Sequence, residues 1–370
     1  MQLPPACPKL CGIATPDRQM QRRHLILIAL LLVLVLPIAI GYLWRDQQPA
    51  APSLPPHSYA KALRQAHDGL PGAARVLYQQ LQRDDLPAIR RAALYAELPH
   101  YPSPQALKLA QQDLEHADPL VRRAAIASIR RLLPAAQRSL VLGPLLEDDE
   151  QSVRFAAVDA LLGLDPDAIG LYFGPLQDAL EQYEQTLEQQ PDDAAAQVHL
   201  ARLYMHEQAY DAATRALQRS LAVAPEGLDA LATQVRLLEQ QGRHDASREV
   251  LAKALALRPD SAFLQYELGR WLTRHEQQEY ALLALARAVE LEPENNEYRY
   301  TLAVTLHQLE QVDAAQKQLE TVLNRQPANR RARVLLIEYW KETGQLQNVQ
   351  VLLAELERQN PDDPYLQQGL

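Results

Sequence analysis

The sequence predicts an all-α fold of stacked helical hairpins, an α-solenoid, preceded by one membrane-spanning helix. Ala, Leu, Gln and Arg dominate the 370 residues, whereas Gly (13) and aromatic residues (6%) are scarce, which favours helix over strand. Prolines recur every 34 residues in the C-terminal half, and an uncharged apolar run of twenty residues lies near the N-terminus. Because the chain is too long for one compact core, we expect two or more structural units.

The apolar run extends from Leu25 to Trp44. At about 1.5 Å per helical residue it spans the roughly 30 Å hydrocarbon core of a bilayer. Arg45 follows it closely, whereas four basic residues precede it: Lys9, Arg18, Arg22 and Arg23. The positive-inside rule therefore predicts a cytoplasmic tail at 1–24, a transmembrane helix at 25–44 and an extracytoplasmic body. We expect a single-pass protein of the inner (plasma) membrane whose bulk lies in the periplasm.

A cleaved signal peptide is the alternative interpretation of this segment. The apolar run is longer than a usual signal peptide's, and no small-x-small cleavage site follows it, which favours the uncleaved anchor. Translation from Met20 instead of Met1 is a further alternative, because residues 1–19 carry no pattern. Cys7 and Cys11 both precede the membrane segment, so the exported part is predicted to hold no disulfide and no haem-attachment motif.

The first repeat series follows a Pro-rich linker at 45–56. Arg90, Arg122 and Arg154 stand 32 residues apart, each followed within three positions by an Ala pair that lets neighbouring helices approach closely. This pattern resembles short HEAT repeats, and the resemblance implies that the recurring Arg links neighbouring inter-helix turns. We expect a HEAT-like domain at 57–165, with an irregular cap at 57–83 and three helical pairs.

The second series is marked by Pro191, Pro225, Pro259, Pro293, Pro327 and Pro361, which stand 34 residues apart without exception. Small residues recur inside the repeats at Ala213, Ala281 and Ala315, where two helices are expected to cross. The period and these positions resemble the tetratricopeptide (TPR) repeat. The resemblance covers 175–363, as a leading helix and five repeats, and leaves a C-terminal tail at 364–370. Ser247 and Val349 replace the small Ala, which predicts local weakening of the second and fifth repeats.

Helix boundaries in this series follow from proline and charge. Each proline is expected to end the second helix of a pair, because it cannot continue the backbone hydrogen bonding of a helix. The acidic residue directly after it is expected to open the next helix, where a negative charge is favourable. These residues are Asp192, Glu226, Asp260, Glu294 and Asp362.

The resemblance implies that the first helix of each TPR pair lines a concave groove. Arg202, Arg236 and Arg270 occupy one repeat position there, and Tyr266 and Tyr300 occupy the position four residues earlier. The remaining candidate groove residues are Met205, His206, Phe263 and Arg274. Guanidinium groups beside aromatic rings predict binding of a partner protein, in particular an extended or acidic peptide segment. In the alternative interpretation, the three arginines form ordinary surface ion pairs with Asp229, Glu239 and Glu267.

Composition and motifs exclude several function classes. Residues 166–370 carry 19 basic and 31 acidic side chains, which argues against nucleic-acid binding. The sequence holds no His-Glu-x-x-His, phosphate-loop or Gly-x-Ser-x-Gly motif, and His206 and His275, each followed by Glu, occupy different repeat positions. We therefore predict no enzyme activity, no cofactor and no metal site.

These observations predict a membrane-anchored extracytoplasmic scaffold that mediates protein–protein interaction in the assembly of an envelope complex. An alternative hypothesis is an accessory factor for maturation of c-type cytochromes or respiratory enzymes. It rests on the order of the repeats, which is similar to the C-terminal repeat region of bacterial multihaem cytochrome proteins. The haem domain of those proteins has no counterpart in this sequence.

Overall fold

The computed structural model describes residues 58–368, and this part of the chain is helical, with no strand. The predicted cytoplasmic tail, transmembrane helix at 25–44 and linker at 45–56 lie outside the described residues. Among the helices of residues 58–368, none has the length and apolar character needed to cross a bilayer. Residues 57–370 form one compact unit, and the fold below is that unit alone.

Short helical hairpins build the first half of this unit, and 3-10 turns close several of them. An apolar core runs through the stack, where Leu94, Val121, Ile129 and Val153 are fully buried. The helices are α2 Tyr59–His67, α3 Ala73–Leu81, α4 Ala88–Glu97, α5 Pro104–Gln112, α6 Pro119–Leu132, α7 Ala135–Leu142, α8 Gln151–Leu161 and α9 Pro166–Ile169. The 3-10 turns are η1 Leu98–His100, η2 Asp113–Glu115, η3 Gly143–Glu147 and η4 Gly170–Tyr172.

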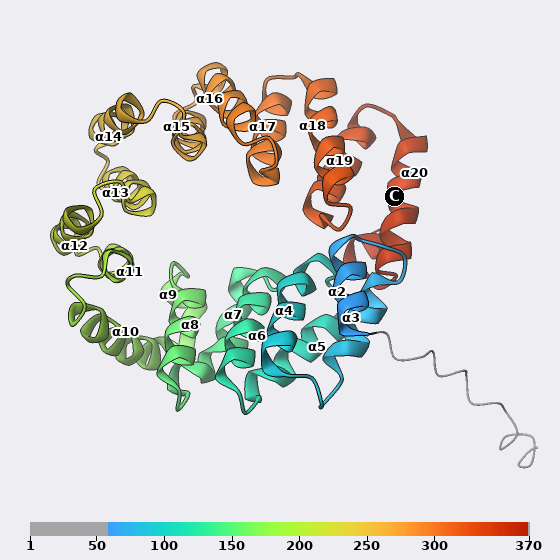
Figure 1. The fold of residues 1–370 in the computed structure, drawn as a ribbon, viewed down its shortest axis with the longest axis horizontal. Helices are drawn as coiled ribbons and strands as arrows, with labels where there is room; N and C mark the ends of the chain where they lie inside the picture. Colours follow the sequence, from blue (N-terminus) through green and yellow to red (C-terminus); the bar gives the residue numbers. More distant parts are fainter. Residues whose placement is uncertain (1–57, 369–370) are drawn as a thin grey trace, which may run out of the picture. The chain divides into compact units, whose positions relative to one another are not determined.

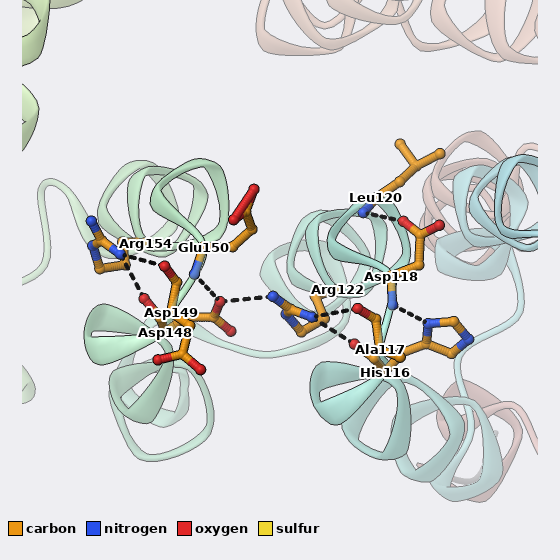
Figure 2. A network of polar contacts seen from close by, with 9 residues as sticks. All are labelled: His116, Ala117, Asp118, Leu120, Arg122, Asp148, Asp149, Glu150 and Arg154. Atoms are coloured by element: carbon orange, nitrogen blue, oxygen red, sulfur yellow. Dashed lines mark hydrogen bonds and ion pairs between the residues drawn. The ribbon is translucent and has the colours of Figure 1, made fainter.

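A recurring arginine joins the turns of successive hairpins, as the HEAT resemblance implies. Arg122 donates from Nη1 to the carbonyl of His116 (2.7 Å) and from Nη2 to Asp148 Oδ1 in the next turn (2.8 Å) (Figure 2). Arg154 repeats the local part of this arrangement by donating to the carbonyls of Asp148 (2.7 Å) and Asp149 (3.1 Å). The turns therefore form a continuous polar network along one edge of the stack.

The prediction for the first member of this series was wrong by one residue. Arg91, not Arg90, occupies the fourth position of its helix, as Arg122 and Arg154 do in theirs. Arg91 is buried and donates to both carboxylate oxygens of Asp113 (3.0 and 3.1 Å). Arg90 instead lies over the ring of Tyr59, 5.3 Å from its centroid. The turn before α4 is one residue out of step with the constant 32-residue spacing.

The second half begins with the long helix α10 (Phe173–Glu188) and continues as five hairpins. In each hairpin the second helix ends two residues before the periodic proline, as predicted. The helices are α11 Ala194–His206, α12 Tyr210–Val223, α13 Leu228–Gln240, α14 His244–Leu257, α15 Ala262–Arg274, α16 Gln278–Leu291, α17 Asn296–Gln308, α18 Val312–Arg325, α19 Arg330–Glu342 and α20 Leu346–Gln359. The predicted tail contains the 3-10 turn η5 (Pro364–Gln368).

The residue that opens each hairpin lies one position later than predicted. Side-chain caps come from Asp193, Ser261, Asn295 and Asn329, each two residues after the proline. Their oxygens accept hydrogen bonds from free amides of the first helical turn. Asp192, Asp260 and Glu294, which precede three of these caps, lie in the turn. These helices therefore begin at a capping side chain that lies one residue beyond the predicted acidic position.

Close helix crossings hold each hairpin together. Ala213, Ala281 and Ala315 are fully buried, as the predicted crossing points require. In the third hairpin even a methyl group is excluded, because a Cβ on Gly269 would lie 2.6 Å from Cγ of Leu285. Helices α11, α13 and α15 line the inner side of the array, and α12, α14 and α16 lie outside them (Figure 1).

The last hairpin contacts the first one, so the solenoid closes into a ring (Figure 1). The backbone amide of Gly72 donates to the carbonyl of Arg358 (2.7 Å), and Asn360 Nδ2 donates to the carbonyl of Pro102 (2.8 Å). Ala328, which precedes α19, is buried in the apolar core of the first half. The concave surface of this unit is therefore an enclosed inner face.

Candidate functional site

A cavity of about 730 Å³ lies on the inner face where the two halves of the ring face each other. Helices α11, α13 and α15 supply most of its wall, and the opposite wall comes from α6 and the end of α8. The lining residues are Arg130, Asp159, Leu162, Gly163, His199, Arg202, Met205, His206, Thr233, Arg236, Glu239, Gln240 and Arg274. Its volume is typical of a ligand-binding cleft.

Positive charge dominates this cavity, although the chain as a whole carries a net charge of −9. Four arginines line it against two carboxylates, Asp159 and Glu239. Burial, together with the like charge of Arg202, lowers the pKa of Arg236, and burial with the charge of Arg270 lowers the pKa of Arg274. Burial raises the pKa of the Asp159 carboxyl. The cavity therefore favours an anionic ligand.

The arginines differ in how far other side chains compensate them. Arg202 forms an ion pair with Asp229. Arg236 donates from Nη2 to Thr233 Oγ1 (3.0 Å), and no carboxylate of residues 58–368 forms an ion pair with it or with Arg274. Arg130 forms no ion pair among these residues either. Arg236 and Arg274 are thus two guanidinium groups of the cavity that are partly removed from water and free to bind a carboxylate.

The structure brings five of the nine predicted groove residues into this cavity: Arg202, Met205, His206, Arg236 and Arg274. The other four, Phe263, Tyr266, Arg270 and Tyr300, are not among its lining residues. Arg270 pairs with Glu267 (3.1 Å) and lies 5.6 Å from the ring centroid of Tyr266, which packs against Tyr298. The ring of Tyr300 is covered by Arg331 at 3.8 Å. The four predicted residues outside the cavity belong to α15 and α17.

The alternative of ordinary ion pairs holds for two of the three arginines. Arg202 and Arg270 pair with Asp229 and Glu267, as that interpretation predicted. Glu239 does not pair with Arg236 and instead contacts His244 and His275. The carboxylate expected to pair with Arg236 is therefore bound to two histidines instead.

Glu239 is the centre of a polar cluster at the edge of the cavity. Its Oε2 lies 2.8 Å from Nε2 of His275, and its Oε1 lies 3.4 Å from Nδ1 of His244. Oε1 also accepts hydrogen bonds from Trp271 Nε1 (2.9 Å) and from the hydroxyl of Ser247. Burial opposes ionisation of Glu239, but the hydrogen bonds from Ser247, His275, Trp271 and His244 outweigh it and lower the pKa of Glu239 to about 2.

The sequence did not reveal two parts of this region. Arg130, Asp159, Leu162 and Gly163 come from the HEAT half, so no TPR repeat position marks them. The Glu239 cluster joins residues 5 and 31 positions apart in the chain, a spacing that matches no short motif. The signal that could have identified it is the polar Ser247, at a position where the other repeats have Ala or Val.

Comparison with protein families assigns both repeat series. A family model of HEAT repeats matches residues 74–162. Three models of the tetratricopeptide repeat match residues 173–226, 210–262 and 297–329. Repeats of these two kinds are typically non-catalytic scaffolds that bind other proteins.

Solved structures with a similar arrangement of helices include MamA, with 20% identity over 43% of this chain and 94% of its own, at a TM-score of 0.37. YrrB, described as a TPR protein with an unusual peptide-binding site, has 21% identity over 51% of this chain and 98% of its own, at 0.36. Yeast Tom70 has 14% identity over 87% of this chain and 64% of its own, at 0.47. No curated protein matches the sequence. The chain therefore contains HEAT repeats followed by tetratricopeptide repeats, a scaffold suited to protein–protein interaction.

Proposed function

We propose that this protein binds an extended, acidic segment of a partner protein in the inner cavity. The observation that carries the proposal is the pair Arg236 and Arg274, two guanidinium groups in a cavity of about 730 Å³ without carboxylate ion-pair partners among residues 58–368. A guanidinium fork binds a carboxylate through two parallel hydrogen bonds, which gives both affinity and orientation. A segment rich in Asp and Glu, or a free C-terminus, supplies that group.

The proposed site predicts a charge-specific loss of binding. A fluorescent peptide of about ten residues rich in Asp and Glu is titrated with the full-length chain, beside a matched peptide in which Asn and Gln replace the acids. We expect the acidic peptide to bind and Arg236→Gln with Arg274→Gln to weaken it at least tenfold, because each charge-assisted hydrogen bond contributes about 1.5–3 kcal/mol. Fluorescence anisotropy measures the affinity, and circular dichroism checks the fold.

Arg287→Gln is the matched control, because Arg287 on the outer helix α16 pairs with Asp260 (2.7 Å) and Glu290 (2.9 Å) away from the cavity. The Arg287→Gln variant should bind the acidic peptide with the same affinity as the unmodified chain. Equal binding of the acidic and amide peptides, or full binding by the double variant, would show that the cavity is not the peptide site.

We further propose that Leu25–Trp44 anchors the body to the inner membrane and that the ring acts outside the cytoplasm, in assembly of an envelope complex. The support is the uncharged apolar run and the basic residues before it. Protease added to spheroplasts should digest the ring and leave an N-terminal tag intact. Protection of the ring with loss of the tag would reverse the orientation.

A further inference from the structure

Glu239, His244 and His275 converge from three consecutive helices of two repeats. Glu239 lies near the end of α13, His244 begins α14 and His275 directly follows α15. One ligand atom from each residue lies within 4.8 Å of the others, and the two imidazole rings meet edge to face at 4.8 Å between centroids. Two imidazoles and a carboxylate thus face one point.

This combination occurs at one junction of the array only. Ser247, which bonds to Glu239, takes the place of Ala213, Ala281, Ala315 and Val349 in the other repeats. The positions equivalent to Glu239 hold Met205, Thr273, His307 and Lys341, and those equivalent to His275 hold Glu207, Gln241, Leu309 and Thr343. Helix packing alone is therefore satisfied without these residues, so their presence at a single junction needs another reason.

Buried neighbours fix the carboxylate in place. Ser247 is fully buried and Trp271 is 4% exposed, and both donate to Oε1 of Glu239. Oε2 accepts a hydrogen bond from His275 alone among the residues that the structure describes. Supporting hydrogen bonds of this kind orient the ligands of metal sites.

We propose that Glu239, His244 and His275 bind a divalent transition-metal ion of the zinc class. Zn²⁺ takes imidazole nitrogen and carboxylate oxygen at about 2.0–2.2 Å, which places two tetrahedral ligands about 3.4 Å apart. His244 is 55% exposed and can rotate to shorten the remaining distance. Imidazole and carboxylate bind the ion only in their deprotonated forms, so binding weakens as the pH falls.

Three protein ligands leave one position of the ion open. Glu239 also lines the inner cavity, so the site lies at the cavity edge beside Arg274 and Gln240. The ion would connect α13, α14 and α15 across the junction of two repeats. It would also add a positive charge next to the two arginines.

Metal binding is tested on the full-length chain, stripped with a chelator, by isothermal titration with Zn²⁺ and by visible absorption with Co²⁺. We expect one strongly bound ion per chain, a tetrahedral Co²⁺ spectrum and weaker binding at lower pH. His244→Ala and His275→Ala should each weaken Zn²⁺ binding at least tenfold. Because the His244 side chain is largely exposed, His244→Ala should leave the fold intact. This variant therefore still tests metal binding if His275→Ala unfolds.

His307→Ala is the matched control. His307 contacts the single carboxylate of Glu342 (2.6 Å) at another junction, a pair with one ligand fewer. This variant should bind Zn²⁺ as the unmodified chain does. Absence of stoichiometric binding, or equal binding by His244→Ala and the unmodified chain, overturns the proposal. Neither result bears on the acidic-peptide site, which is measured without metal.

Discussion

The hydrogen-bond partners of Glu239 determine the pKa of its carboxyl group. Removal from water disfavours its charge, yet four donors stabilise the ionised form and lower its pKa to about 2. The unfolded chain holds the same carboxyl near its ordinary pKa of about 4.3. Because the pKa of Glu239 is lower in the folded chain than in the unfolded chain, its hydrogen bonds stabilise the fold fully at pH values above about 4.3. This stabilisation is lost as the pH falls towards 2 and the carboxylate is protonated.

Glu239→Gln should therefore flatten the acid sensitivity of the fold. Between pH 5 and pH 2.5, measured with a chelator present, the unmodified chain should lose on the order of 2 kcal/mol more stability than the variant. Thermal unfolding followed by circular dichroism gives the comparison. Glu249→Gln is the control, because Glu249 forms an exposed ion pair with Lys253. If the stability of the Glu239 variant and of the unmodified chain fell equally with pH, Glu239 would not be the source of the acid sensitivity.

At the scale of the element, the arginine network of the HEAT hairpins is asymmetric. Arg122 bonds both its own turn and Asp148 of the next, and both side chains are largely buried. Arg154 donates to two carbonyls of its own turn. Arg122 thus joins two hairpins, whereas Arg154 fixes one (Figure 2).

Arg122→Ala should destabilise the ring by about 3 kcal/mol, because it leaves a buried carboxylate unpaired. Arg154→Ala removes hydrogen bonds to neutral groups and should cost about 1–2 kcal/mol. Arg123→Ala, at an exposed position of the same helix, should change stability by less than about 0.5 kcal/mol. Thermal unfolding monitored by circular dichroism ranks the three. Equal losses for Arg122 and Arg154 would mean that the bond to Asp148 contributes nothing.

Elements defined by a local period could be predicted from the sequence, and their exact starts could not. The 34-residue prolines predicted the end of each second helix, because proline acts on the backbone beside it. The observed helix starts lie one residue after the predicted ones, because Asp193, Ser261 and Asn295 cap the helices through side-chain hydrogen bonds. The acidic residue before each of them does not form the cap. The same applies to Arg91. A constant repeat spacing cannot predict that one turn is a residue shorter or longer than the others.

Part of the candidate site could likewise be predicted from the sequence, and part could not. Arg202 and Arg236 could be predicted as neighbours because stacking places equal repeat positions together, and the charge of Arg202 indeed affects Arg236. Arg130 and Asp159 could not, because they belong to the HEAT half, and the packing of α8 and α11 on α10, not a repeat period, brings them to the cavity. Only contacts between distant parts of the chain decide that half of the site.

At the scale of the whole ring, closure depends on a glycine. Gly69 has a φ of +61°, and a Cβ there would lie 2.6 Å from the backbone nitrogen of Ala328 in the last TPR hairpin. Asn360 and Pro102, which bond across the same closure, are 258 residues apart in the chain. Nothing in either repeat series encodes this contact, so a solenoid with open ends was the natural expectation from sequence.

Gly69→Ala should therefore open the ring without unfolding its hairpins. Hydrogen exchange of the full-length chain, followed by mass spectrometry, should show faster exchange at Gly72, whose amide donates to Arg358, and around Ala328. Gly163→Ala is the matched control, because Gly163 also has a positive φ (+80°) but no atom within 4 Å of the added methyl. It carries the same backbone strain and should leave exchange at the closure unchanged. Slow exchange at Gly72 in the Gly69 variant would mean that the ring tolerates the side chain.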